Sequence, residues 1–266
     1  MRLDGKIALV TGAGQGMGEA IAVAMAEQCA AAVAVADRNA DTAEATAARV
    51  REPDARAEVI ACDLRERDQI EGMIDQGVAA FGGLDVLVNN AGVVETMIAP
   101  DTRVDEISEE VWDTVYEVNL KATWLATKFA APHLRTSRRD PNIVNAASVA
   151  SVAANPRGPA YAASKGGVLQ LTRATAIDLG PHIRCNCFCP GLIATPMAIG
   201  HLRSAADTER AERDAVSRSI LPRMGRPEEV ANLVCFLASD AASYCTGGAY
   251  FVDGGMMASR APMRHH

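Results

Sequence analysis

A tyrosine and a lysine four residues apart are the residues of this chain best suited to proton transfer. Tyr161 and Lys165 fall in a helical pattern over residues 158–179, so their side chains share one helix face. A free tyrosine titrates at about pH 10, too high for a base at neutral pH, and a nearby ammonium lowers that pKa by stabilising the phenolate. The pair predicts a tyrosine that exchanges a proton with a substrate oxygen.

A serine lies thirteen positions before the tyrosine, just after an apolar strand pattern. Ser148 follows residues 142–146, and a short connection can fold the helix of Tyr161 back upon it. Its hydroxyl can hold a substrate oxygen beside the phenol while a hydride passes between a cofactor and the carbonyl carbon. The expected chemistry is the interconversion of an alcohol and a ketone.

A glycine-rich turn near the amino end provides a place for such a cofactor. The sequence TGAGQGMG, residues 11–18, follows the first apolar run and opens the first helical pattern. Gly12 permits the sharp turn, Gly16 lets the backbone approach a pyrophosphate, and Gly18 lets helix and strand pack closely. Because the start of a helix offers free N–H groups to phosphates, we expect a dinucleotide here.

An acidic residue indicates which dinucleotide is bound. Asp37 ends the second apolar run, where a carboxylate can accept hydrogen bonds from a ribose diol and would repel a 2′-phosphate. Gln15 brings no positive charge to the glycine turn, so NAD is favoured over NADP. Arg38 follows Asp37 directly and could neutralise a phosphate, which leaves acceptance of NADP open. Asp37 could also be an ordinary solvent-facing acid at a strand end.

Strand and helix patterns alternate along the chain, which predicts a single α/β domain over residues 1–266. We expect a Rossmann-like, doubly wound parallel sheet of about seven strands with helices on both faces. Strands are expected at residues 7–10, 31–36, 58–61, 84–89, 142–146, 183–188 and 249–252. Helices are expected at residues 17–28, 41–51, 66–81, 108–133, 158–179 and 227–238.

Two long irregular segments begin just after strand ends, at residues 93–107 and 193–226. Loops of this length in a compact domain are usually functional, so the second is expected to be a substrate lid carrying a charged amphipathic helix within residues 201–218. Apolar residues recur in both segments, and they either anchor the loops to the core or line a partly apolar substrate site. They are Met97, Ile98, Met197, Ile199, Leu202 and Met224.

Composition excludes several kinds of partner. The formal net charge of −7 disfavours nucleic acid and anionic membrane surfaces, because both repel an acidic protein. No stretch approaches the roughly 20 apolar residues of a membrane helix, and residues 1–6 lead into a strand rather than a signal peptide. We expect a small-molecule substrate and a cytoplasmic location.

The cysteines favour neither disulfides nor a metal site. Their odd number, 7, and irregular spacing are typical of reduced side chains in an intracellular enzyme. Cys185, Cys187 and Cys189 alternate along a strand, whereas zinc-binding cysteines usually lie on turns with two to four residues between them. We therefore expect no metal.

The ordered set of motifs resembles the short-chain dehydrogenase/reductase family in its single-domain form. The resemblance covers residues 11–255, through the glycine turn, NNAG at 89–92, Asn119, Ser148, YAASK at 161–165 and PG at 190–191. It implies that Asn119, Ser148, Tyr161 and Lys165 are the catalytic residues. It also implies that Lys165 binds the nicotinamide ribose, and that Asn119 holds a water linking Lys165 to bulk solvent.

The resemblance further implies which residues bind the cofactor. Asp63 and Leu64 correspond to the adenine contacts, the segment 90–92 lies beside the ribose, and the segment 190–195 contacts the nicotinamide carboxamide and the diphosphate. NNAG could equally be a plain strand-ending turn, and Thr195 could cap the lid helix. The full expected set is Gly12, Gln15, Gly16, Met17, Gly18, Asp37, Arg38, Asp63, Leu64, Asn90, Ala91, Gly92, Tyr161, Lys165, Pro190, Gly191, Ile193 and Thr195.

The resemblance implies a homotetramer, formed through the helices at 108–133 and 158–179 and through the final strand. Two other functions stay open. A 3-oxoacyl-thioester reductase would by family habit use NADPH, against which Asp37 argues. A non-catalytic NAD-binding protein would have no need of the intact Ser148, Tyr161 and Lys165 set. The substrate, its stereochemistry and the direction of reaction are not specified by these motifs.

Overall fold

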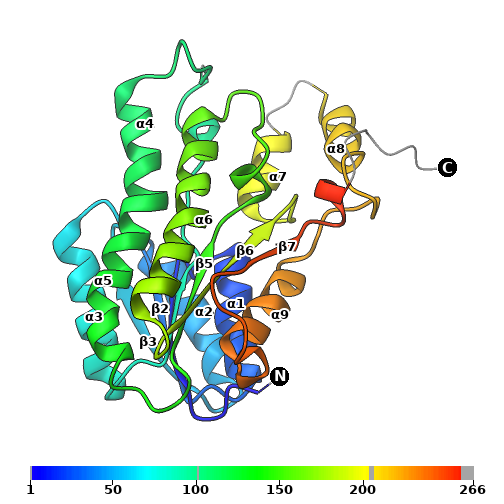
Figure 1. The fold of residues 1–266 in the computed structure, drawn as a ribbon. Coiled ribbons are helices and arrows are strands. Elements are labelled where there is room, and N and C mark those ends of the chain that lie inside the picture. Colours follow the sequence, from blue (N-terminus) through cyan, green and yellow to red (C-terminus); the bar gives the residue numbers. More distant parts are fainter. Residues whose placement is uncertain (1, 101, 204–206, 259–266) are drawn as a thin grey trace.

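The computed structural model describes residues 2–100, 102–203 and 207–258 and is built around one parallel sheet (Figure 1). Seven strands follow the order β3-β2-β1-β4-β5-β6-β7. This confirms the predicted doubly wound sheet. The strands are Ile7–Thr11 (β1), Ala32–Asp37 (β2), Arg56–Ala61 (β3), Val86–Asn89 (β4), Asn142–Ala146 (β5), Arg184–Pro190 (β6) and Ala249–Val252 (β7).

The central strands are continuous runs of small and β-branched residues because both of their faces are covered by helices. In register, Val10 of β1 lies beside Val35 of β2 on one side and Val88 of β4 on the other. All three side chains are fully buried. Burial on both faces is typical of parallel sheets and explains why these strands lack an alternating polar pattern.

Two helical layers cover the sheet (Figure 1). One face packs against α1 (Gly16–Glu27), α2 (Ala40–Arg51) and α9 (Pro227–Ala238), in a core that includes Ile21 and Val234. The other face packs against α3 (Arg67–Phe81), α5 (Ala122–Leu134) and α6 (Pro159–Leu179). Helix residues Ile74 and Leu125 pack there with strand residues Leu9, Leu87 and Ile143, and Val168 of α6 packs with Cys187 of β6. Short helices connect these elements at Glu95–Met97 (η1), Val149–Ser151 (η3), Asp240–Ala242 (η4) and Met256–Ala258 (η5).

The helix expected at residues 108–133 is interrupted. It begins as predicted after Ser108, whose Oγ accepts a hydrogen bond from the Val111 N–H at 3.3 Å. α4 (Glu109–Tyr116) is then followed by a π-helical turn, Glu117–Lys121 (η2), before α5 begins. Such turns are frequent at functional sites because the wider backbone re-aims a side chain, and this one contains Asn119.

The segment at 193–226 contains two helices rather than an irregular loop. They are α7 (Pro196–Arg203) and α8 (Thr208–Val216), and residues 204–206 lie outside the described structure. Asp207 caps α8 by accepting a hydrogen bond from the Arg210 N–H at 2.9 Å. α8 buries none of its residues, as the charged pattern within 201–218 indicates. Arg218 then donates to Asn155, in the loop before α6, at 3.0 Å.

Among the described residues, none of the helices combines the length and the apolar content needed to cross a bilayer.

Gly18 allows α1 to pack directly on the end of β1. A Cβ atom at this position would lie 2.0 Å from the Gly12 carbonyl oxygen and 2.5 Å from Asn90 Nδ2. The first of these is backbone, so the turn itself would have to move to accept a side chain.

We therefore expect Gly18→Ala to lower the free energy of unfolding by about 1–3 kcal/mol, through overpacking. Gly72→Ala is the matched control, because Gly72 also lies inside a helix but its nearest neighbour would be a flexible Gln76 atom at 3.8 Å. That control should be stabilised by about 0.5–1 kcal/mol. Urea unfolding of both variants provides the measurement, and equal effects on stability would contradict the packing account.

Candidate active site

The predicted site residues lie at the carboxyl ends of neighbouring strands. β2 and β4 flank β1 on opposite sides, so the chain reverses its direction of travel across the sheet at β1 and β4. Ligands of open α/β sheets bind in the crevice outside such a switch point. The glycine turn follows β1, Asn90 follows β4, Ser148 follows β5 and Pro190 ends β6.

The glycine turn is shaped to receive an anion. Gly12 and Gly16 both have a φ of +62°, a left-handed conformation that side chains disfavour. α1 begins directly after Gln15, which makes no side-chain cap hydrogen bond within the described structure. The first N–H groups of α1 are thus available to a phosphate. Met17 packs with its partly buried side chain against the core.

Asp37 is fixed at the end of β2, beside this turn. Its Oδ2 accepts a hydrogen bond from the Gly14 N–H at 2.9 Å, and its Oδ1 accepts one from the Asn39 N–H at 3.0 Å. Each carboxylate oxygen has a further lone pair for a ribose hydroxyl. The residue type and its position both fit the diol of a dinucleotide.

A cavity of about 610 Å³ opens next to Asp37, between the ends of β2 and β3. Arg38 and Asp63 line it, whereas Leu64, the other residue of the expected adenine pair, does not. Arg65 also lines it and forms an ion pair with Asp63 at 2.6 Å, and this contact lowers the pKa of the Asp63 carboxyl. Leu64 is half-buried against the core beneath. The cavity offers room for an adenosine moiety at the position that the sequence predicts.

The end of β4 is bound to the glycine turn through Asn90 and Thr11. Asn90 Nδ2 donates to the carbonyl oxygens of Thr11 and Gly12 at 3.0 and 3.2 Å. In return, the Thr11 hydroxyl oxygen accepts from the N–H groups of Asn90 and Ala91 at 3.1 and 3.2 Å. Asn90 Oδ1 is buried with no hydrogen-bond partner among the described residues. A free acceptor next to the turn fits a ligand with hydroxyl or amide donors.

Lys165 carries its ammonium into the interior. The side chain is buried, and its Nζ donates to the Ala146 carbonyl oxygen, at the end of β5, at 2.7 Å. Burial lowers the pKa of Lys165 to about 8. A Cβ atom on Gly92 would lie 3.3 Å from this Nζ and 3.2 Å from Asn119 Oδ1. The loop after β4 can approach both side chains because residue 92 is glycine.

Asn119 lies in the π turn and is held in place by its amide. Its Oδ1 accepts from the Val93 N–H at 2.8 Å, and its Nδ2 donates to the Val93 carbonyl oxygen at 2.9 Å and to Ser164 Oγ at 3.0 Å. Ser164 directly precedes Lys165 on α6. Asn119 therefore connects the loop after β4 with the catalytic face of α6.

Ser148 and Tyr161 meet at the substrate side of this cluster. The Ser148 hydroxyl is near enough to the Tyr161 phenol to lower the pKa of that phenol, and Lys165 Nζ lies 5.7 Å from the centre of the phenol ring. Ser148 Oγ accepts from the Ala150 N–H at 3.0 Å, and Ser151 Oγ donates to the Lys165 carbonyl oxygen at 2.8 Å. The structure thus brings the four predicted catalytic side chains into one cluster.

The sequence predicts that Lys165 lowers the pKa of Tyr161. For the protein without a bound cofactor, this prediction is wrong. Burial raises the pKa of Tyr161, the hydrogen bond from Ser148 lowers it, and the negative charge of Glu95 raises it, so that the net shift is upward. Burial is the largest of these effects because the low-dielectric surroundings disfavour a phenolate. Lys165, meanwhile, donates to Ala146 rather than to the phenol.

The segment after β6 lies against the glycine turn. Gly191 permits a close approach to Asp253, since a Cβ atom at Gly191 would be 2.8 Å from Asp253 Cα. Ile193 is buried and pairs with Gly225 in an isolated bridge. Thr195 Oγ1 accepts from the Ala198 N–H at 3.3 Å, so Thr195 caps α7, and its methyl group would lie 3.2 Å from a Cβ atom on Gly16. Its position therefore fits both of the roles considered from sequence.

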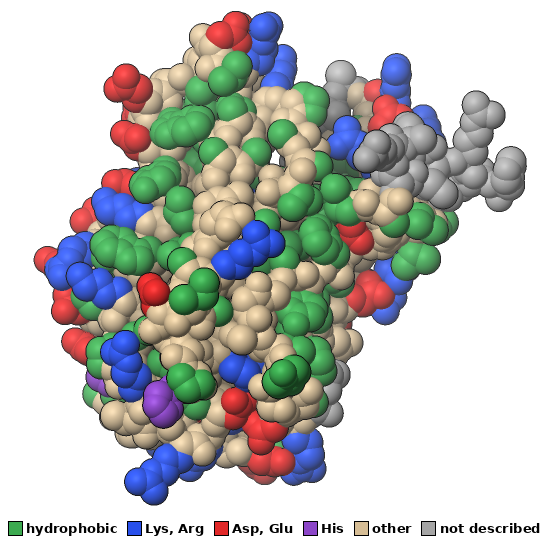
Figure 2. Space-filling model, viewed as in Figure 1, with side chains coloured by type: hydrophobic (Ala, Val, Ile, Leu, Met, Phe, Trp, Pro, Cys, Tyr) green, Lys and Arg blue, Asp and Glu red, His purple; other side chains and the backbone are tan. Residues whose placement is uncertain are grey.

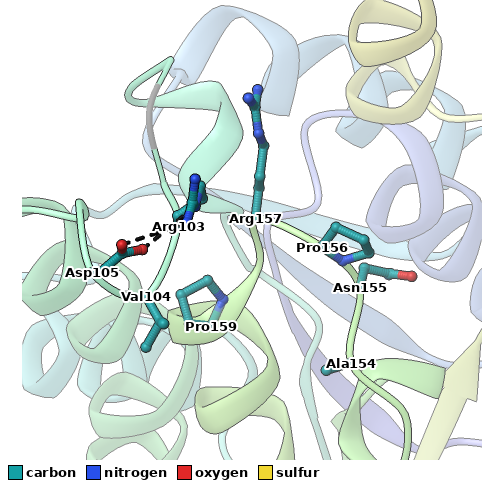
Figure 3. Close-up of a pocket in the computed structure, with 8 residues that line it drawn as sticks. All are labelled: Arg103, Val104, Asp105, Ala154, Asn155, Pro156, Arg157 and Pro159. Carbon is teal, nitrogen blue, oxygen red and sulfur yellow. Dashed lines mark hydrogen bonds and ion pairs between the residues drawn. The ribbon is translucent and has the colours of Figure 1, made fainter.

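A second cavity, of about 490 Å³, opens in front of α6 (Figure 3). Residues 103–105 line one side and residues 154–157 the other, with Pro159 at its floor. Arg103 is paired with Asp105, and Figure 3 shows Arg157 extending past the opening. Because Pro159 is two residues before Tyr161, this cavity opens beside the catalytic turn of the helix.

Sequence reasoning missed several residues that shape the site. Thr11, Glu95 and Ser151 act through hydrogen bonds to backbone N–H and C=O groups, and the Ala146 carbonyl oxygen binds Lys165. Thr11 is the first residue of the glycine-rich motif and Ser151 lies three residues after Ser148, which is a weak signal for both. Glu95 had none, because an acidic residue in a loop is ordinarily solvent-exposed.

The three cysteines of β6 are buried in the sheet. Burial raises the pKa of the Cys185 thiol. Within the described residues, no group of three or more His, Cys, Asp or Glu side chains is arranged to hold a metal ion.

Known proteins resemble this chain along nearly all of its length. Residues 12–257 match the family described as Enoyl-(Acyl carrier protein) reductase. The 3-oxoacyl-[acyl-carrier-protein] reductase FabG of Thermotoga maritima is 37% identical over 97% of this chain and 100% of its own. Cyclopentanol dehydrogenase of Comamonas sp. is 34% identical, over 97% of this chain and 99% of its own.

A solved structure agrees with these relatives. It is a short-chain type dehydrogenase/reductase from Mycobacterium marinum, which is 33% identical, superposes with a TM-score of 0.84 and covers 97% of both chains. Fold, motif order and similarity over the full domain agree: the chain belongs to the short-chain dehydrogenase/reductase family of oxidoreductases.

Proposed function

We propose that this protein interconverts a secondary alcohol and a ketone with NAD, using Ser148, Tyr161, Lys165 and Asn119. The observation that carries the proposal is that Lys165 Nζ lies 5.7 Å from the centre of the Tyr161 ring, in a turn of α6 that Asn119 joins through Ser164. The Ser148 hydroxyl is near enough to the phenol to lower its pKa. A hydroxyl and a phenol side by side can both hold one substrate oxygen.

In the oxidative direction, the substrate hydroxyl gives its proton to the Tyr161 oxygen while Ser148 holds the substrate oxygen in place. NAD, when bound, supplies the acceptor for the hydride that leaves the same carbon, and its positive ring favours the phenolate form of Tyr161. The buried Lys165 ammonium acts in the same sense once it is oriented towards the phenolate. In reduction, the Tyr161 phenol donates its proton to the forming alkoxide.

NAD is the proposed cofactor because Asp37 is fixed beside the glycine turn by two backbone N–H groups. Its charge would lie next to the 2′-position of the adenosine ribose and repel a phosphate there.

The proposed substrate is partly apolar. Met97 and Ile98 leave 54% and 44% of their side chains exposed, close in sequence to the catalytic Gly92 segment. Leu202 is buried, so it anchors the lid segment, whereas Met197 and Ile199 are half-buried. Exposed apolar residues on the loop beside the site favour a hydrocarbon body on the substrate.

A 3-oxoacyl-thioester reductase using NADPH is the second candidate. The similarity to the Thermotoga maritima reductase favours it, and exposed Arg38 lines the cavity in which a 2′-phosphate would lie. Asp37 opposes it. A non-catalytic NAD-binding protein is a third candidate, and it would not need a buried Lys165 beside a tyrosine.

We also propose that the protein is a homotetramer. Large apolar side chains are exposed on α4 and α5, and further ones on α6 and the edge strand β7; they are Trp112, Tyr116, Trp124, Ile177 and Phe251. Figure 2 shows hydrophobic side chains gathered over this face of the molecule. Exposed apolar surface of this kind is typical of an interface between subunits.

Tyr161→Phe should reduce turnover by at least about a hundredfold, because it removes the proton donor and acceptor. The measurement is the change in reduced-cofactor absorbance with NAD and a panel of secondary alcohols and ketones. Turnover that survives this substitution would contradict the proposed role of Tyr161. A wild-type protein that binds NAD but turns over no member of the panel would favour the non-catalytic candidate.

Asp37→Asn should raise the ratio of kcat/KM for NADP to that for NAD by roughly tenfold or more, since it removes the charge. Its single amide oxygen can keep the hydrogen bond from the N–H of either Gly14 or Asn39. Asp68→Asn is the control, because it removes an exposed charge from the first turn of α3, at a position that does not line the cavity next to Asp37. A wild-type preference for NADP would instead support the biosynthetic reductase.

Sedimentation should show a species of about four times 28.0 kDa, and Trp124→Glu should shift it towards smaller species because it places a charge in the apolar patch. A wild-type protein that sediments as a 28.0 kDa monomer would contradict the tetramer.

A further inference from the structure

Glu95 is an acid in an unusual environment. It is the first residue of η1, in the loop after β4, and its side chain is fully buried. The described residues include no salt bridge to it. Buried carboxylates are costly unless hydrogen bonds compensate for lost hydration, so its partners should reveal what the residue does.

Those partners are two N–H groups at the start of the catalytic helix. Glu95 Oε1 accepts from the Ala160 N–H at 2.9 Å and from the Tyr161 N–H at 3.1 Å. Helix α6 begins at Pro159, and the preceding Gly158 has no side chain with which to cap it. Glu95 therefore supplies, from far along the chain, the acceptor that a Ser or Asp at the N-cap would normally provide.

The loop that carries Glu95 also contacts the other catalytic side chains. Gly92 lies against Lys165 Nζ, and both backbone groups of Val93 are hydrogen-bonded to the Asn119 amide. Three neighbouring contacts thus join one short segment to Lys165, Asn119 and the turn containing Tyr161. A displacement of this segment would therefore move Lys165, Asn119 and Tyr161 together.

The second carboxylate oxygen makes Glu95 more than a simple cap. Glu95 Oε2 is buried with no hydrogen-bond partner among the described residues. A neutral capping side chain would satisfy the same N–H groups without burying this oxygen and its charge. The ionisable side chains beside the phenol are Glu95, from η1, and Lys165, from α6, and the end of β5 contributes the Ser148 hydroxyl.

We propose that Glu95 is a positioning residue for Tyr161, which holds the first turn of α6 against the loop after β4 and places its negative charge at the backbone of Tyr161. This inference rests on the proposed function, since it deepens the role of the same tyrosine. Glu95 touches neither substrate nor cofactor in this account. It acts through the backbone of Tyr161 and through its charge.

Two substitutions separate the cap from the charge. Glu95→Gln keeps an oxygen that can accept from both N–H groups but removes the charge. Glu95→Ala removes both. Ser108→Ala is the matched control, because it removes the N-cap of α4, an interaction with the Val111 N–H that lies outside the catalytic helix.

Glu95→Ala should lower kcat by about ten- to a hundredfold with little change in KM for NAD, because a small displacement of a reacting group is enough for such a loss. Glu95→Gln should restore most of kcat. Ser108→Ala should leave kcat within about twofold of the wild type, although thermal unfolding is expected to show a loss of stability for it as well. Equal kcat values for Glu95→Ala and the wild type would overturn the proposal.

The pH dependence of kcat/KM tests the effect of the Glu95 charge on Tyr161. In alcohol oxidation Tyr161 must be deprotonated, so kcat/KM rises with pH through the pKa of the phenol. The Glu95 charge raises this pKa, and removing it should move the rising limb of the Glu95→Gln profile to lower pH. A rising limb at the wild-type position would overturn the electrostatic part of the proposal.

Amide hydrogen exchange tests the contact without any turnover. The N–H groups of Ala160 and Tyr161 should exchange faster in Glu95→Ala than in the wild type, and near the wild-type rate in Glu95→Gln. If the wild type turns over no substrate, the proposed function fails while this result still decides the contact. Unchanged protection at both positions in Glu95→Ala would overturn the positioning role.

Discussion

The site depends on a single buried positive charge. Lys165 extends from α6 into the interior, and the acceptor that its ammonium meets there is the Ala146 carbonyl oxygen at the end of β5. An ammonium away from water is costly, and a lowered pKa of about 8 reflects that cost. The arrangement is possible because Gly92 leaves room for Nζ and because Asn119, in a π-helical turn, holds the adjoining loop. The end of β5, Gly92 and the π turn together make it possible to bury this charge.

The same edge of the sheet also forms the place for the dinucleotide. The turn after β1 needs glycines because the backbone reverses there and α1 packs against it, and Asn90 joins that turn to the end of β4. Asp37 is oriented by the turn itself, through the Gly14 N–H. The proposed cofactor-binding and catalytic residues are therefore placed by neighbouring strands of one sheet. The segments that would adapt to a substrate, α7 and α8, bury few of their residues and lie at the periphery.

The sequence was sufficient for the doubly wound parallel sheet, its helical layers and the grouping of the candidate catalytic residues, because apolar runs, glycine spacing and the Tyr161 to Lys165 spacing are local signals. It was not sufficient for features that depend on tertiary contact. The π turn at Asn119 breaks a helical pattern that is continuous in sequence. The buried Glu95 lies in a loop where acids are ordinarily exposed, and its partners are 65 and 66 residues away. The pKa of Tyr161 moves in the direction opposite to the expected one, because spacing reveals the nearby ammonium but not the depth of burial.

Tyr161 is a partly buried phenol, and in the proposed mechanism it becomes an effective base when a positive charge approaches it. The most direct test of this central claim is an ultraviolet difference titration of the tyrosinate band, wild type minus Tyr161→Phe, with and without NAD. The account predicts a Tyr161 pKa above the ordinary value of 10.0 in the free protein and a lower pKa once NAD is bound. A Tyr161 that titrates below 10.0 without NAD, or at the same pH with and without it, would contradict the account.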